Sequence, residues 1–386
     1  MNESLPPPIW VDTPQALKRM IDDLQCWPQL AVDTESNGLH AYREQVCLIQ
    51  ISTPENDYLI DPLRLRDLQP LAPIFADAGV EKIFHAAGYD LLCLYRDFGF
   101  KVFPLFDTMH AARVLGQRAV GLDALLERYF HVQLDKRHQK ADWAERPLSA
   151  ERMEYARLDT HYLIPLRQIL GEELQQSGRW ELAQEDFQRM SLEALSLPAH
   201  PPRWERLAHA HALTGRQRTL LQALWEWREE TARQLNRPPF KVIGETVLLQ
   251  LVRTPPQGLY DLTRCGLSGR QVRIWGEAIL RVVERAQMLE VPKYVPPPTV
   301  DAARLDRLEQ LKAWRKRVAQ RWGVESDVIL PRSLLERLAQ RNPLTWDELQ
   351  QVLNDSPWRL RTFGEELLAV LRECAAMSPS PAMNTK

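Results

Sequence analysis

Two carboxylates separated by one residue end a short apolar run, in the stretch Leu30-Ala31-Val32-Asp33-Thr34-Glu35. On a β-strand, this spacing places the side chains of Asp33 and Glu35 on the same face. Two neighbouring anions repel, and each resists ionisation beside the other. Such a pair is typical of a site where a cation lies between the two groups, or of a surface where water disperses the repulsion.

Two further carboxylates lie at or within predicted elements. Asp90 comes just after a predicted strand at 82–86, at the start of a helix. Asp159 lies inside a long predicted helix, and Tyr155 precedes it by four residues on the same helix face. Because Asp159 is flanked by apolar residues, its carboxylate needs a partner or a ligand.

The four carboxylates have no obvious cationic partners in the sequence, and carboxylate oxygens are ligands that Mg²⁺ prefers. Two such ions about 4 Å apart can hold the attacking and leaving oxygens of a phosphodiester. A phenol such as Tyr155 can orient the attacking water. Taken singly, the features also fit a solvated turn, an acidic helix N-terminus and a buried hydrogen-bonded pair. Their combination favours phosphodiester hydrolysis.

Prolines divide the chain into three parts, with predicted linkers at 197–203 and 291–300. The first part predicts three short strands in an antiparallel meander, at 30–35, 45–53 and 57–61. Further strands and helices follow, including a long helix over 149–174 with Ser149 as its N-cap. This mixture indicates an α/β or α+β layered domain.

The remaining two parts are helical and resemble each other. Trp227-Arg228 aligns with Trp314-Arg315 at an offset of 87, and after one inserted residue Gly276-Glu277 aligns with Gly364-Glu365. A shared Trp-Arg pair followed by the same helical register indicates two copies of one small helical domain.

The composition, with 386 residues of which 45% are hydrophobic and 26% charged, is that of a globular protein of two or three domains. We find no basic, apolar leader and no apolar run long enough for a membrane span, so no membrane association is expected. Five cysteines without a CxxC pair fit a reducing cytoplasm and argue against a zinc knuckle or a disulfide framework. The chain also lacks P-loop, GxGxxG and HExxH motifs, which leaves ATPase, dehydrogenase and zincin functions without support.

The net charge of −2 conceals an uneven distribution. Residues 203–290 contain 14 Lys and Arg against nine Asp and Glu, an excess of +5, so the remainder carries −7. A basic middle segment can hold a polyanion, although such an excess also occurs on solvated surfaces.

The combined pattern resembles the ribonuclease D family, in the tyrosine-bearing (DEDDy) subgroup of the DEDD 3′-5′ exonuclease superfamily. The first family motif is similar to AVDTE (31–35), the second to KIFHAAGYDLLCL (82–94) and the third, Tyr-x-x-x-Asp, to YARLD (155–159). The helical repeats resemble HRDC domains, and the second departs more from that pattern. The resemblance implies an α/β ribonuclease H-like exonuclease domain at 1–195, HRDC-like bundles at 204–290 and 303–376, and a disordered tail at 377–386.

The resemblance also implies a mechanism. Asp33, Glu35, Asp90 and Asp159 would hold two Mg²⁺ or Mn²⁺ ions, and Tyr155 would orient the water. Nucleoside 5′-monophosphates would leave from the 3′ end of RNA, with tRNA precursors and other small structured RNAs as substrates. The protein is expected to be a cytoplasmic monomer. Ser36 stands where the commonest family members carry a bulky apolar residue, which bears on substrate preference.

Two strand residues beside the expected site, His85 and Gln50, are candidates for nucleic-acid contact, although a histidine at a strand end is more often structural. Three other functions stay open at this stage. A DNA 3′-5′ exonuclease of the same superfamily would use the same metal site. A catalytically inactive nucleic-acid-binding protein would keep the fold, but all five catalytic positions are present here. An α/β protein with helical scaffolding and no catalysis is disfavoured by the specificity of the motifs.

Overall fold

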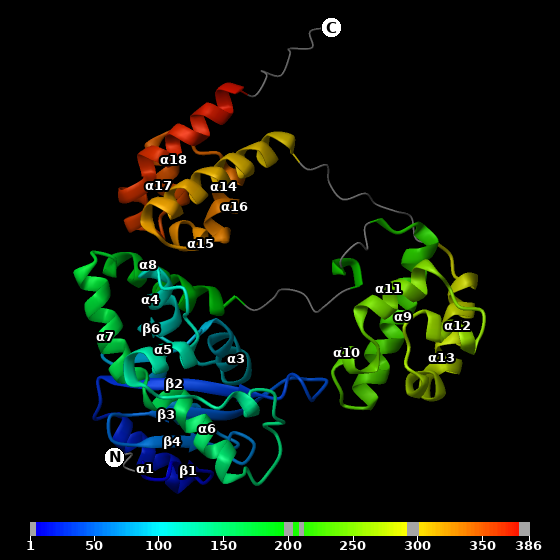
Figure 1. Ribbon diagram of the computed structural model, residues 1–386, viewed down its shortest axis with the longest axis horizontal. Helices are drawn as coiled ribbons and strands as arrows, with labels where there is room; N and C mark the ends of the chain where they lie inside the picture. The colour runs from blue at the N-terminus through cyan, green and yellow to red at the C-terminus, as the bar shows by residue number, and fades with distance from the viewer. Residues whose placement is uncertain (1–4, 197–203, 208–211, 292–300, 378–386) are drawn as a thin grey trace.

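A computed structural model describes residues 5–196, 204–207, 212–291 and 301–377, which form three parts (Figure 1). We call them the α/β domain (5–196), the first bundle (212–291) and the second bundle (301–377). Most of the predicted linkers, and the predicted tail apart from Met377, lie outside the described residues. Among the helices of these described ranges, none is long and apolar enough to span a membrane.

A six-stranded mixed sheet, ordered β1-β4-β3-β2-β5-β6, forms the centre of the α/β domain. Its strands are β1 (Ile9–Val11), β2 (Gln29–Ser36), β3 (Val46–Ser52), β4 (Asp57–Ile60), β5 (Glu81–Phe84) and β6 (Leu105–Asp107). The predicted antiparallel meander β2-β3-β4 is confirmed, and β5 and β6 extend the sheet in parallel from β2. The three-residue strands β1 and β6 were not predicted, because such short segments carry no measurable periodicity.

Eight α-helices surround the sheet within the described α/β domain. They are α1 (Pro14–Leu24), α2 (Ala72–Ala76), α3 (Gly88–Phe98), α4 (Thr108–Val114), α5 (Leu122–Phe130), α6 (Ala150–His161), α7 (Leu163–Gln176) and α8 (Trp180–Ala194). Ser149 caps α6 as predicted, since its hydroxyl accepts the N–H of Arg152 at 3.3 Å. The predicted single helix over 149–174 is wrong, because it divides after His161. Pro165 explains the break, since proline has no N–H and its ring clashes with the carbonyl four residues earlier.

The two bundles repeat the same five helices. The first bundle contains α9 (Gly215–Gln234), α10 (Pro239–Val242), α11 (Glu245–Arg253), α12 (Leu259–Arg264) and α13 (Gly269–Met288). The second contains α14 (Ala302–Trp322), α15 (Ser326–Ile329), α16 (Arg332–Arg341), α17 (Trp346–Val352) and α18 (Pro357–Met377). The first four helices of each bundle start 87 residues apart and the last pair 88 apart, which confirms the repeat with its single inserted residue.

The aligned glycines have the same role in both bundles. A Cβ at Gly276 would lie 2.7 Å from the side chain of Leu259, and one at Gly364 would lie 2.7 Å from that of Trp346. Glycine therefore permits close approach of the last helix of each bundle to the first residue of the preceding helix.

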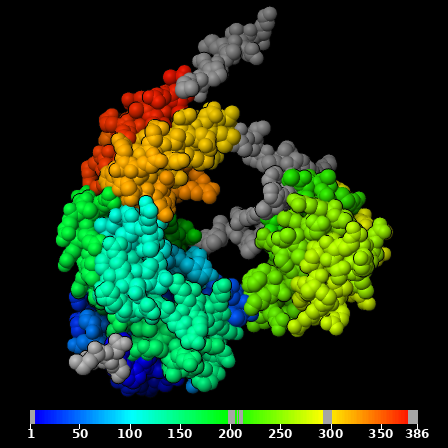
Figure 2. Space-filling view, in the orientation of Figure 1, coloured from blue at the N-terminus to red at the C-terminus, as the bar shows by residue number. Residues whose placement is uncertain are grey.

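The second bundle is packed into the α/β domain. Val328 belongs to the hydrophobic core of that domain, and Trp322, Val324 and Trp358 pack against the same core. The two parts form a continuous surface in Figure 2, and α18 contacts α8. The second bundle is thus docked on the α/β domain through a shared hydrophobic core.

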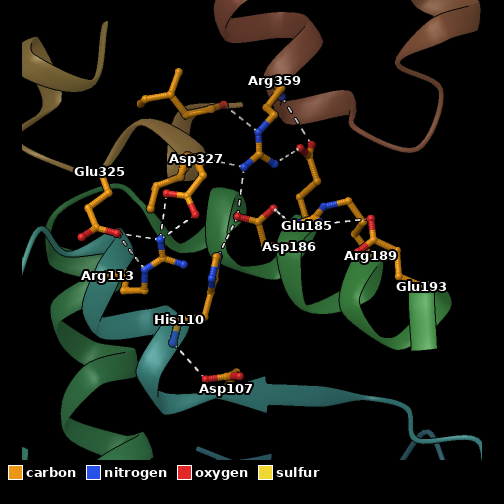
Figure 3. A network of polar contacts seen from close by, with 12 residues as sticks. Asp107, His110, Arg113, Glu185, Asp186, Arg189, Glu193, Glu325, Asp327 and Arg359 are labelled. Atoms are coloured by element: carbon orange, nitrogen blue, oxygen red, sulfur yellow. Dashed lines mark hydrogen bonds and ion pairs between the residues drawn. The ribbon is translucent and has the colours of Figure 1, made fainter. Parts of the chain in front are cut away.

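A buried polar network reinforces this contact (Figure 3). Arg359 of α18 is 0% exposed and donates to Glu185 at 2.6 Å and to Asp186 at 2.9 Å, both on α8. His110 of α4 also contacts Asp186, at 2.7 Å. Burial alone would raise the pKa of Asp186, but the charges of Arg359 and His110 and their hydrogen bonds hold it well below its usual value.

The first bundle meets the α/β domain through the connection between β2 and β3 (Figure 1). Tyr42 in this connection donates its hydroxyl to Glu229 at 3.3 Å and its backbone N–H to the side chain of Asn236 at 3.3 Å. The guanidinium of Arg233 lies 5.6 Å from the Tyr42 ring centroid. These contacts are polar and few compared with the buried docking of the second bundle.

Candidate active site

The strand end carrying the predicted carboxylates opens into a cavity of about 450 Å³. Four of the five predicted catalytic residues line it, namely Asp33, Glu35, Tyr155 and Asp159. Other lining residues are Thr34, His85, Gly121, Leu122, Asp123, Leu134, Lys136 and Gln139. The cavity therefore collects residues from β2, the end of β5, α5 and α6.

The sheet and one helix position the central carboxylates. Asp33 and Glu35 face the same side of β2, which pairs with β3 on one edge and β5 on the other. A register shift between Glu35 and Ser36 ends the regular pairing directly after the second carboxylate. Helix α6 packs against β2, β3 and β4, and this packing brings Tyr155 and Asp159 to the strand end.

Asp90 lies in the first turn of α3 but does not line the cavity. Its carboxylate is 8% exposed and accepts the Thr34 hydroxyl at 2.5 Å. In the part of the chain that the structure describes, no three His, Cys, Asp or Glu side chains converge tightly enough to form a preformed metal cage. The orientation of Asp90 toward Thr34 agrees with this.

The surroundings of the four predicted metal-binding carboxylates oppose their ionisation. Burial and the charges of Asp90, Asp159 and Glu35 raise the pKa of Asp33 well above its usual value. Burial and the charges of Asp159 and Asp90 do the same to the pKa of Glu35. Burial raises the pKa of Asp90 to about 6, and burial with the charge of Asp90 raises that of Asp159 to about 7.

Nearby positive charge would favour full ionisation of these four carboxylates at neutral pH. Among the described residues, no Lys, Arg or His forms an ion pair with Asp33, Glu35, Asp90 or Asp159. Lys136 lies in the same cavity, but its ammonium pairs with Asp123 at 2.7 Å. Oxygen-only donors without a protein cation fit hard divalent ions such as Mg²⁺ or Mn²⁺.

Tyr155 presents a phenol to the same cavity. Its ring lies 5.9 Å from that of Trp143, which is 1% exposed and fixes one side of the tyrosine. Burial and the charges of Asp159, Glu35 and Asp33 raise the pKa of Tyr155 far above its usual value. The hydroxyl is therefore protonated at neutral pH and available as a hydrogen-bond donor.

The two residues predicted to contact nucleic acid have different positions. His85 lines the cavity, and its Nδ1 is 2.9 Å from the Thr108 hydroxyl. Burial lowers the pKa of His85, which favours the neutral imidazole. The Thr108 hydroxyl donates to the Phe84 carbonyl, so Nδ1 of His85 donates to Thr108 and Nε2 is left as an acceptor. Gln50 lies opposite Asp33 on β3, is 0% exposed and does not line the cavity. A direct contact of Gln50 with nucleic acid is therefore not expected.

Several residues that support the site were not identified from the sequence. Asp107 at the end of β6 accepts the backbone N–H groups of Ala86 and Ala87, at 3.2 and 2.7 Å, in the connection from β5 to α3. Ala86 has a φ of 64°, which is uncommon for a non-glycine residue. Asp107 also accepts the N–H of His110 at 2.9 Å (Figure 3). It thus holds the start of the helix that carries Asp90.

Ser36, which stands where the commonest family members carry a bulky apolar residue, forms a hydrogen bond that an apolar side chain could not form. The Ser36 hydroxyl donates to Glu44 at 2.6 Å, and Glu44 also accepts hydrogen bonds from Tyr89 and, at 2.9 Å, from Arg96. A polar residue at position 36 thus connects the end of β2 to α3 through Glu44. No short sequence pattern marks this arrangement, because Glu44 and Arg96 are 52 residues apart.

Comparison with known proteins places these features in context. A 3′-5′ exonuclease domain family matches residues 8–175, and the HRDC domain family matches 217–283 and 304–371. The chain is 31% identical to ribonuclease D of Musicola paradisiaca, over 94% of this chain and 98% of that protein. It is 35% identical to the exosome complex exonuclease RRP6 of Saccharomyces cerevisiae, over 66% of this chain and 38% of that protein.

A solved structure resembles nearly the whole chain. The crystal structure of Escherichia coli RNase D, described as an exoribonuclease involved in structured RNA processing, superposes with a TM-score of 0.70 at 29% identity. The match covers 95% of this chain and 99% of that one. It therefore includes the α/β domain and both helical bundles.

Proposed function

Because the chain belongs to the ribonuclease D family and is a 3′-5′ exoribonuclease, we propose that the cavity at Asp33 is its catalytic centre. The observation that carries this proposal is the meeting of Asp33, Glu35, Asp159 and Tyr155 in one cavity. Within the described ranges of the chain, no Lys, Arg or His is paired with these carboxylates. The proposed reaction is hydrolysis of the 3′-terminal phosphodiester of RNA with release of a nucleoside 5′-monophosphate.

In this proposal, the carboxylates of Asp33, Glu35, Asp90 and Asp159 would hold two Mg²⁺ or Mn²⁺ ions. Bound divalent ions supply positive charge for the phosphodiester oxygens and lower the pKa of a water molecule. The protonated Tyr155 hydroxyl donates a hydrogen bond that orients the attacking water. His85 lies at the cavity wall as a neutral imidazole whose Nδ1 bonds to Thr108.

Replacing Tyr155 by phenylalanine tests the role of the hydroxyl. The ring still packs against Trp143, so we expect the fold and metal binding to be retained. The turnover rate should fall about 10²-fold or more, the scale of a lost orienting or acid-base group. Single-turnover rates of RNA shortening, with Mn²⁺ affinity measured on the same samples, provide the test. An unchanged rate would exclude the phenol from the chemical step.

The natural substrates are proposed to be tRNA precursors and other small structured RNAs with single-stranded 3′ ends. Residues 203–290, a range that contains most of the first bundle, carry a charge excess of +5. This excess supports an electrostatic contribution of the first bundle to RNA binding. Discrimination of RNA from DNA depends on contacts to the 2′-hydroxyl.

A time course on 5′-labelled RNA with a structured body and a single-stranded 3′ tail tests the proposal. The same oligomer as DNA and an Asp33→Ala variant are run beside it, with identification of the released nucleotide. Stepwise shortening of RNA with release of 5′-monophosphates, weaker on DNA and absent in the variant, is the expected result. Equal digestion of DNA would contradict the proposed preference for RNA, and full activity of the Asp33→Ala variant would contradict the cavity as the catalytic centre.

A further inference from the structure

A groove continues the active-site cavity toward the first bundle. It has a volume of about 530 Å³ and shares Thr34, Glu35 and Gln139 with the cavity. Residues 238–240 of the first bundle form its other end. A polymer whose last phosphodiester lies at the carboxylates can therefore extend through this groove to the first bundle.

Three aromatic side chains are among the residues that line the groove. Tyr42, Tyr89 and Phe240 present aromatic rings, and Tyr89 and Phe240 are 52% and 53% exposed. No Lys or Arg of the described residues lines it, and the Glu44 carboxylate is already occupied by Ser36, Tyr89 and Arg96. These rings offer faces on which nucleic-acid bases stack. One cation lies beside them, because the Arg233 guanidinium is 5.6 Å from the Tyr42 ring centroid.

Residues 238–240 of the first bundle differ from their counterparts in the second bundle, residues 325–327. At the offset of 87, Phe240 corresponds to Asp327 of the second bundle, and Pro238 corresponds to Glu325. Both acidic residues pair with Arg113 of the α/β domain, at 2.6 and 2.7 Å.

The residue next to Phe240 differs between the bundles in the same sense. Lys241 is exposed in the first bundle, whereas its counterpart Val328 is buried in the core of the α/β domain. One edge of the duplicated fold is thus used for docking in the second bundle. In the first bundle the same edge carries an exposed ring beside the active site.

We propose that the groove lined by Tyr42, Tyr89 and Phe240 binds the single-stranded RNA that precedes the 3′-terminal nucleotide, with its bases stacked on these rings. This inference rests on the proposed function and assigns the first bundle a contact to bases in addition to its charge. Phe240 is the residue through which that bundle reaches the strand.

RNA affinity of full-length variants tests the proposal. All proteins carry Asp159→Ala to prevent degradation, and the probes are labelled RNAs with a common structured body and 3′ tails of increasing length. Adding Phe240→Ala should weaken binding of the long-tailed RNAs about 5- to 100-fold, the range for loss of one base–aromatic stack. The loss should be larger for long tails than for the shortest, and Phe240→Trp should restore affinity.

Tyr260→Ala is the matched control, because this ring is 77% exposed on α12 of the same bundle and does not line the groove. It should bind every probe like its parent, and Phe240→Ala should leave the slope of affinity against salt unchanged. Equal affinity of the Phe240→Ala variant for all tails, an equal loss in Tyr260→Ala, or a changed salt slope would each overturn the proposal. Failure of the unsubstituted enzyme to shorten RNA would instead refute the proposed function itself.

Discussion

Replacing Asp159 by alanine should abolish turnover while RNA binding is retained. The substitution removes a ligand from the carboxylate group at the point where α6 meets β2. Since charge stabilisation by bound metal ions contributes several kcal/mol to such reactions, we expect the rate to fall by at least about 10³-fold. Asp33→Ala should have the same effect. The rate is measured as single-turnover shortening of 5′-labelled RNA, and affinity by anisotropy.

Asp123→Ala provides a matched control for this prediction. Asp123 lines the same cavity but pairs with Lys136 at 2.7 Å and is not one of the proposed metal ligands. Its loss should have a far smaller effect on the rate. A near-normal rate in Asp159→Ala or Asp33→Ala would contradict the assignment of the metal ligands.

Replacing Arg359 by methionine should destabilise the protein by about 3 to 5 kcal/mol, the cost of leaving buried charges without a partner. The guanidinium is fully buried and contacts Glu185 and Asp186 of the α/β domain. It also donates to the backbone carbonyls of Val328 and Ile329, at 2.8 and 2.9 Å. We expect a lower midpoint of denaturant unfolding and earlier proteolysis of the second bundle.

Arg361→Met is the matched control. Arg361 joins the same two helices, α18 and α8, through an ion pair with Glu181. The side chains of Arg361 and Glu181 are 61% and 62% exposed. An exposed pair contributes at most about 1 kcal/mol. The unfolding midpoints of the two variants should therefore differ clearly. Equal midpoints would show that the Arg359 network does not hold the second bundle in place.

The features that the sequence predicted depend on local periodicity or on fixed spacing. The strand carrying Asp33 and Glu35 followed from a short apolar run, and the duplicated bundles followed from the offset of 87. The placement of Tyr155 and Asp159 on one helix face followed from their spacing of four. Each of these patterns is contained within a short stretch or in a direct comparison of two stretches.

The features that were missed depend on partners distant in the chain. Arg359 is buried in contact with Glu185 and Asp186, which lie more than 170 residues earlier in the chain. No local sequence pattern specifies that pairing. Gln50 lies opposite Asp33 on β3, in the strand that was predicted for it. Its burial was missed, because it results from the covering of both faces of β3. The orientation of Asp90 toward Thr34 depends on a side-chain rotation, which sequence spacing does not specify.

The number of Mn²⁺ ions bound by the full-length protein, measured by titration calorimetry, tests the central claim most directly. The unsubstituted chain should bind about two ions, as expected for a pair of ions that clamps a phosphodiester. Asp33→Ala should lose at least one of them, whereas Asp123→Ala should bind as the unsubstituted chain does. Identical Mn²⁺ binding by the unsubstituted chain and Asp33→Ala would contradict the carboxylate site as the metal centre of this exoribonuclease.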